Sequence, residues 1–221
     1  SVEAVSVRGS DNVFIPYAAW MALDRTERLG LEALGDWILG MILGVGVLLV
    51  TARLARLSAA GAVLVFLVTV LSYALAGLHW LLPMLVLYAL YLAVRRSGFI
   101  SAVYVVGPSS AGSMLIVLLF AHTDDPALLL PYLTTVAANG AMAASLLTRR
   151  RPDLQPVAVA LGTLLPIASA RLLVPDSPLL LPVAGGLLSL LVYEALSRTP
   201  LVGRRFFASA GCGLAMWWLA V

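Results

Sequence analysis

The sequence has little charge and no lysine. Only 11% of its 221 residues are charged, and all 14 basic residues are arginine. Without lysine, the chain cannot form a Schiff base on a lysine amine, so retinal proteins are excluded. The single cysteine, Cys212, cannot form an internal disulfide. The sequence also lacks paired histidines, a cysteine cluster, a Walker loop and a Gly-x-Ser-x-Gly motif, so nothing in it supports a zinc or serine hydrolase.

Hydrophobic residues are abundant instead. They make up 62% of the chain, and the mean hydropathy is +1.01, whereas a typical soluble domain is about 45–50% apolar and about 25% charged. Apolar runs recur at the length of roughly 20 residues that a helix needs to cross a bilayer. The sequence therefore predicts an all-α polytopic transmembrane bundle with about eight spans, at 35–52, 60–76, 78–94, 99–121, 127–148, 154–174, 178–197 and 206–221.

The charges between these predicted spans alternate in sign. Arginines follow the first, third, fifth and seventh spans, at Arg53 and Arg56, Arg95 and Arg96, Arg149 to Arg151, and Arg198, Arg204 and Arg205. The opposite ends carry His79, the pair Asp124 and Asp125, and Asp176. Because arginine-rich turns stay in the cytoplasm, we expect the cytoplasmic membrane of a bacterium or archaeon, with the C-terminus outside.

Residues 1–34 form a charged N-terminal segment that differs from the rest of the chain, 35–221. Its apolar run at 13–23 is too short to span a bilayer unaided,. An interfacial segment is one interpretation. The other is a crossing supported by neighbouring protein, which would leave 24–36, with a net charge of −2 from four acidic and two basic residues, on the outer side.

The opening of this segment, SVEAVSVRGSDNVFIPYAAWMAL, resembles the C-terminal end of the phytol kinase and dolichol kinase family. The resemblance rests on Glu3, the pair Asp11 and Asn12, and Pro16. Members of that family phosphorylate long isoprenoid alcohols with a nucleoside triphosphate, commonly CTP. Their glycine and aspartate motif for nucleotide and metal lies upstream of the matched segment, so we expect it before Ser1 or in a separate kinase partner.

From Leu57 onward the chain resembles a second family, of the phytyl-phosphate kinase type. LSAAGAVLVFLVTVLSYALAGLHWLLP is similar to its opening helical pair, TTVAANGAMAASLL carries its Ala-Asn-Gly motif at 138–140, and YEALSRTPLVGRRF is similar to its end. The chain departs from this family at IASARLLVPDS, where Arg171 stands in place of an expected carboxylate. That departure argues against independent catalysis.

The resemblance implies phosphoryl transfer from CTP or ATP with Mg²⁺. Such a reaction needs cations and carboxylate-held Mg²⁺ to spread charge over the transferred group. Glu3, Asp11 and Asn12 are therefore the candidate catalytic residues, with Asp11 as a Mg²⁺ ligand. The alternative is that Asp11 and Asn12 cap a helix that begins near Phe14, since both are favoured N-caps.

Two polar features fall within predicted spans. GPSSAGS, at 107–113, is expected to loosen the fourth span around Pro108, and Asn139 lies at similar depth in the fifth,. Ser109, Ser110 and Asn139 are the candidate substrate-binding residues, in a polar pocket for a membrane lipid or prenol. The alternative is close helix packing through small residues and an interhelical amide bond.

Three functions remain open from the sequence. The first is a prenol or prenyl-phosphate kinase, or the C-terminal module of one. The second is a small transporter or lipid flippase built around a broken fourth span. The third is a non-catalytic membrane domain that docks a kinase partner. No basic surface of the kind that binds nucleic acid is expected.

Overall fold

A computed structural model describes residues 30–55, 59–96, 102–148, 151–176 and 179–195, together with the isolated positions 20, 23, 24, 27, 211 and 215. All regular structure in these ranges is helical. The elements are α2 (Leu31–Ala55), α3 (Ala59–Ala76), α4 (Leu78–Arg96), α5 (Ala102–Thr123), η2 (Pro126–Leu128), α6 (Leu129–Leu147), α7 (Gln155–Arg171) and α8 (Leu180–Ala195). The all-α prediction is confirmed, and seven of the predicted apolar segments are helices. The segment at 206–221 and the run at 13–23 lie almost entirely outside the described residues.

Short turns that need special backbone geometry separate several of these helices. Gly77 joins α3 to α4 with φ +85°, a conformation that glycine adopts without steric cost. Between α5 and α6, Asp124 has φ +51°. The carboxylate of Asp125 accepts a 2.9 Å hydrogen bond from the backbone N–H of Ala127, and Pro126 begins the short 3₁₀ turn η2. These residues end one helix and start the next within a few positions.

Helix α6 forms the centre of the bundle and packs against α4, α5, α7 and α8. Every residue from Leu130 to Ser145 is buried. Its middle is composed of small residues, and a very close contact with α7 is made there. An added Cβ on Gly140 would lie 2.0 Å from the carbonyl oxygen of Gly162 in α7, so only two glycines allow the backbones of α6 and α7 to approach this closely.

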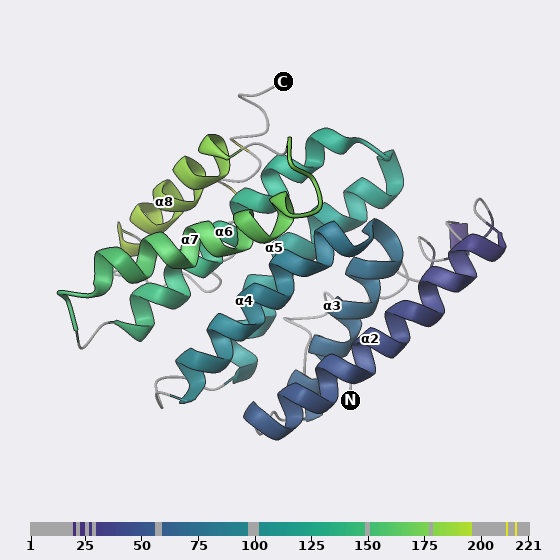
Figure 1. Ribbon diagram of the computed structural model, residues 1–221, viewed down its shortest axis with the longest axis horizontal. Coiled ribbons are helices and arrows are strands. Elements are labelled where there is room, and N and C mark those ends of the chain that lie inside the picture. The colour runs from purple at the N-terminus through teal and green to yellow at the C-terminus, as the bar shows by residue number, and fades with distance from the viewer. Residues whose placement is uncertain are drawn as a thin grey trace.

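Helix α2 lies at the edge of the bundle, opposite α8 (Figure 1). It packs chiefly on α3. Gly40 and Gly44 form the contact: a Cβ added at Gly44 would meet the side chain of Val70 at 2.8 Å, and one at Gly40 would meet the Val70 carbonyl oxygen at 3.3 Å. The remaining faces of α2 are exposed. Apart from Arg53 in the last turn, the large exposed side chains that the structure describes on α2 are hydrophobic: Leu31, Leu34, Ile38, Leu39, Met41, Ile42, Val45, Leu49, Val50 and Leu54.

An aromatic cluster joins α4, α5 and α6 near one end of the bundle. The ring of Trp80 lies 4.6 Å from that of Tyr132 and 4.7 Å from that of Phe120, measured between centroids. The phenol of Tyr132 donates a hydrogen bond to the backbone carbonyl of Trp80. Trp80 and Tyr132 are fully buried, so this cluster ties the start of α4 to the start of α6.

Two of the described helical segments are long and apolar enough to cross a membrane. They are Leu34–Thr51, with a mean hydropathy of 2.0, and Pro126–Leu147, with a mean hydropathy of 1.3. Shorter apolar segments lie at Ala62–Ala76, Leu78–Ala93, Ala111–Thr123 and Leu180–Val192.

Candidate functional site

The candidate catalytic residues Glu3, Asp11 and Asn12 lie outside the described residues. The Mg²⁺ assignment to Asp11 therefore stays a prediction from the sequence. Among the residues that the structure does describe, no group of three or more His, Cys, Asp or Glu side chains could hold a metal ion. The described bundle thus offers no metal centre of its own, and we derive no reaction step through Mg²⁺ from it.

Ser109 and Ser110 lie on α5, and the structure describes their backbone but not their side chains. We expected the GPSSAGS segment to interrupt this helix. Instead, α5 is a single α-helix from Ala102 to Thr123. A continuous helix lacks the break that the transporter hypothesis required, so the observation that motivated that hypothesis is absent from α5.

Asn139 lies in the fully buried middle of α6. Its side-chain Nδ2 donates a 2.9 Å hydrogen bond to the backbone carbonyl of Thr135, one turn earlier in the same helix. The next residue, Gly140, forms the close contact with Gly162. Helices α4, α5, α7 and α8 surround this helix, so the amide is enclosed by protein at the tightest crossing of the bundle.

Several other hydroxyl groups in the core bond within their own helices. Thr134, Thr135, Thr163 and Ser189 each donate to the carbonyl oxygen four residues earlier, at 2.8 to 2.9 Å. This pattern is common in apolar surroundings, where a hydroxyl has few other partners. A side-chain bond between helices connects α7 to α6, from Nε2 of Gln155 to Oγ of Ser145 at 3.0 Å. Most of these buried polar groups are thus bonded within the described core, and the buried hydroxyl of Ser113 has no hydrogen-bond partner among the described residues.

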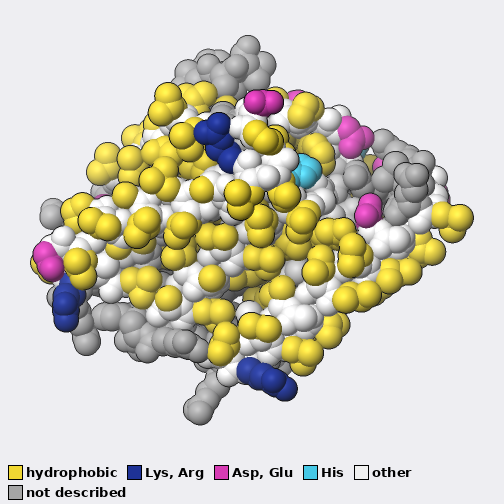
Figure 2. All heavy atoms as spheres, in the orientation of Figure 1, with side chains coloured by type: hydrophobic (Ala, Val, Ile, Leu, Met, Phe, Trp, Pro, Cys, Tyr) yellow, Lys and Arg dark blue, Asp and Glu magenta, His cyan; other side chains and the backbone are white. Residues whose placement is uncertain are grey.

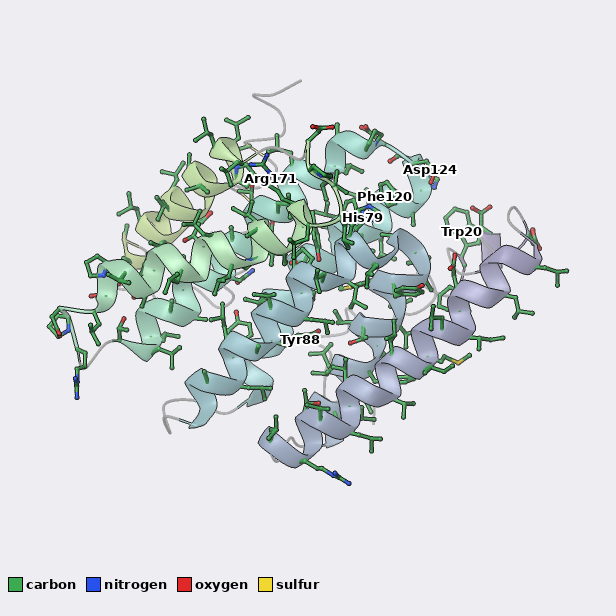
Figure 3. The ribbon with its side chains drawn as sticks, viewed as in Figure 1. Trp20, His79, Tyr88, Phe120, Asp124 and Arg171 are labelled. Carbon is green, nitrogen blue, oxygen red and sulfur yellow. The ribbon has the colours of Figure 1, made fainter. Side chains whose placement is uncertain are left out.

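A group of polar and aromatic residues gathers at one end of the bundle. Figure 3 shows Trp20, His79, Phe120 and Asp124 near this end, with Tyr88 farther along the helices. The rings of Trp20 and His122 lie 5.9 Å apart, and those of His79 and Trp80 lie 6.3 Å apart. His79 lies at the start of α4 and His122 in the last turn of α5.

Arg171 lies at the same end of the bundle, in the last turn of α7 (Figure 3). Its guanidinium donates two hydrogen bonds, at 3.1 and 2.9 Å, to the backbone carbonyl of Pro175. These bonds close the turn after α7, which gives Arg171 a structural role.

An apolar groove on the outer surface between α7 and α8 was not predicted. It has a volume of about 360 Å³ and is lined by Pro156, Val159, Ala160, Thr163, Leu164, Val183 and Leu187. Its residues come from two helices that the sequence does not relate to each other, and all of them except Thr163 are ordinary apolar residues. Sequence reasoning therefore had no signal for it.

Comparisons with known protein families, with curated proteins and with solved structures found no match to this chain.

Proposed function

We propose that this chain is a polytopic membrane protein in which α2 to α8 are seven of eight spans. The observation that carries the proposal is the distribution of exposed side chains. Large hydrophobic residues are exposed along α2, and others along α7 and α8: Leu154, Val157, Leu161, Leu164, Leu165, Leu172, Leu173, Leu179, Leu180, Leu181, Leu187, Leu188 and Leu191. Hydrophobic side chains cover the face seen in Figure 2, and charged groups lie at its margins.

In water this surface would be strongly unfavourable. The largest apolar patch of a soluble monomer is typically about 300–600 Å², and the exposed leucines, isoleucines and valines of α2 alone run the length of a 25-residue helix. In a bilayer the same side chains face hydrocarbon. The charged residues fit that medium, because Arg53, Asp124 and Arg171 lie in the last turn of a helix or in the turn that follows it,.

The proposed orientation follows from the arginines. Arg53 ends α2, and Arg151 lies in the turn between α6 and α7. Asp124 and Asp176 lie in the turns after α5 and α7, at the other ends of their helices. An arginine-rich cytoplasmic side and an acidic outer side agree with the positive-inside rule, and place Val221 outside if the eighth span forms.

Single-cysteine labelling in intact cells tests both claims, after Cys212→Ser removes the native thiol. Cysteines introduced at Asp125 and Asp176 should react with a membrane-impermeant maleimide, whereas cysteines at Arg53 and Arg151 should react only after the cells are opened. The reverse pattern contradicts the orientation. Release of the protein from membranes by alkaline carbonate contradicts the membrane location itself.

For its biochemical role, we propose that the chain is the membrane module of an isoprenoid-alcohol or prenyl-phosphate kinase. The support is the resemblance at 1–23 and from Leu57 onward, together with the apolar surface of the bundle. A prenol is soluble only in the bilayer, so its kinase must hold the alcohol from the membrane and a triphosphate from the cytoplasm. Glu3, Asp11 and Asn12 are the residues assigned to the phosphoryl-transfer chemistry.

A prenol phosphorylation assay tests this assignment. It uses the complete protein with Mg²⁺, a polyprenol and labelled CTP or ATP. Asp11→Asn keeps the capping ability of the residue, because Asn and Asp cap about equally well, but removes the negative charge that a hard cation requires. We expect this variant to lose most of its activity, while Asp153→Asn, at an exposed position, keeps it. If Asp11→Asn has wild-type activity, Asp11 has only a helix-capping role and its catalytic assignment is wrong.

A non-catalytic domain that docks a kinase partner is the second candidate. It is favoured by the hydroxyl groups of α6, α7 and α8 that bond within their own helices, and by the structural role of Arg171. The assay above separates the two candidates. A complete protein that transfers no phosphoryl group under any nucleotide, but co-purifies with a soluble kinase, would favour docking.

A further inference from the structure

The chemistry of the groove between α7 and α8 is restricted. Its one polar lining side chain, Thr163, already donates its hydroxyl hydrogen to the carbonyl of Val159 at 2.8 Å. Pro156 has no backbone N–H, and the other lining side chains are hydrocarbon. A sugar, nucleotide or peptide would leave its polar groups without partners here, at a cost in free energy. The groove therefore suits a hydrocarbon chain.

The position of the groove indicates where such a chain would come from. Its lining residues extend along α7 from Pro156, in the first turn, to Leu164, a length of about 12 Å at 1.5 Å per residue. Leu161 of α7 and Leu188 of α8, each next in sequence to a lining residue, are exposed. The groove thus continues the apolar surface that we assign to the bilayer and opens to it from the side.

The end of the groove at Pro156 lies a few residues after Arg151 in the chain. Arg151 is exposed in the turn that leads into α7, and in the sequence it is the last of three consecutive arginines. Residues 149–153 of the sequence hold these three arginines and one aspartate, a net charge of +2. A ligand whose hydrocarbon chain lies in the groove could therefore direct its polar end toward the end of α7 that Arg151 precedes.

We propose that α7 and α8 form a binding site for one anionic phospholipid, with an acyl chain in the groove and the phosphate at Arg151. The inference rests on the proposed membrane location of the bundle. It does not depend on the kinase assignment, and it assigns no substrate. Positive charge at the membrane surface attracts anionic headgroups by about 1 kcal/mol for each arginine, so the headgroup distinguishes this ligand from the neutral lipids around it.

The test is native mass spectrometry of the protein released from vesicles of phosphatidylcholine with a minor share of phosphatidylglycerol. The wild type should retain one phosphatidylglycerol in preference to phosphatidylcholine. Arg151→Gln should reduce that preference about fivefold, the factor equivalent to about 1 kcal/mol. Ala160→Phe should abolish retention, because the ring fills the groove. Ala168→Phe is the matched control, since Ala168 is also an exposed alanine of α7 but lies outside the lining.

The outcomes separate this inference from the membrane proposal. If the wild type enters the vesicles but retains no phosphatidylglycerol in preference, the lipid site is wrong and the membrane location stands. If Ala160→Phe retains as much lipid as Ala168→Phe, surface charge alone accounts for the retained lipid, and the groove is not a binding site. Retention of an added polyprenol in place of phosphatidylglycerol would also overturn the proposal, because that ligand lacks the phosphate. Failure of the wild type to enter vesicles contradicts both proposals.

Discussion

Helices α2 and α6 are both long and apolar, yet they occupy opposite environments. The span Leu34–Thr51 of α2 has a mean hydropathy of 2.0, and 17% of its residues are buried. Pro126–Leu147, which contains α6, has a mean hydropathy of 1.3, and 94% of the residues in its most apolar 18-residue window are buried. The more hydrophobic helix is therefore the exposed one. In water the hydrophobic effect would favour the reverse arrangement, so the pair supports the proposed membrane location of the bundle.

The residue types of the two helices explain this arrangement. The buried middle of α6 is rich in alanine, glycine, serine and threonine, and such small residues let helix backbones approach in membranes, where packing rather than exclusion of water drives association. The exposed faces of α2 carry leucine, isoleucine, valine and methionine. Large side chains are exposed on α2, and small side chains on α6 allow close contact with the neighbouring helices.

The largest effect is expected from a charge on the exposed face of α2. Ile42 lies near the middle of the helix and is 62% exposed. In a bilayer, Ile42→Asp should impair membrane insertion by about 2.5–3.5 kcal/mol, whereas in water an exposed aspartate would be harmless. Insertion is measured by the fraction of protein that resists carbonate extraction. Leu31→Asp is the control, because Leu31 is 86% exposed at the start of the same helix and should be tolerated. Equal insertion of both variants and wild type would contradict the comparison.

A second effect concerns the close contact of α6 with α7. In Gly140→Ala the new Cβ would lie 2.0 Å from the Gly162 carbonyl oxygen, so the helices must separate. We expect destabilisation by about 1–3 kcal/mol, the usual cost of overpacking, seen as a lower thermal midpoint in detergent. Gly46→Ala on α2 is the matched control, because nothing lies within 4 Å of its added Cβ. A midpoint for Gly140→Ala as high as that of Gly46→Ala would mean that α6 and α7 do not meet in this way.

The smallest effect is expected at Asn139. Its Nδ2 bonds to the carbonyl of Thr135 within the same helix, and side-chain hydrogen bonds in membrane proteins average about 0.6 kcal/mol, with a maximum of about 1.7. Asn139→Leu should therefore lower stability by no more than this amount and leave prenol phosphorylation by the complete protein unchanged. Lost phosphorylation with normal stability would support a substrate-binding role instead.

The helices themselves could be predicted from the sequence, and their arrangement could not. The predicted segments at 60–76 and 78–94 agree within two residues with Ala59–Ala76 and Leu78–Arg96, because runs of apolar residues and the turn glycine Gly77 are local signals. The central place of α6 and the contact between Gly140 and Gly162 depend on residues far apart in the chain. A hydropathy profile ranks α2 above α6 and holds no information on which of them is enclosed.

At the candidate site, too, local features could be predicted from the sequence and contacts between distant residues could not. The sequence indicated that Asn139 sits among small residues, and the structure adds that four helices enclose it. The expected interruption of α5 was wrong, because one proline in an apolar sequence lowers helix propensity without deciding the backbone path against tertiary packing. The groove between α7 and α8 requires the relative position of two helices, which no local pattern specifies.

The most direct test of why the more hydrophobic α2 is exposed and α6 is buried is to measure whether the exposed face of α2 lies in lipid or in water. Nitroxide labels on single cysteines at Leu31, Ile42 and Leu54, in a Cys212→Ser background, would be compared for collision with oxygen and with a water-soluble nickel chelate. We predict that oxygen access relative to nickel access peaks at Ile42 and falls toward both ends of the helix, as it does across a bilayer. High nickel access at all three positions would show that this face of α2 lies in water, and the account would be wrong.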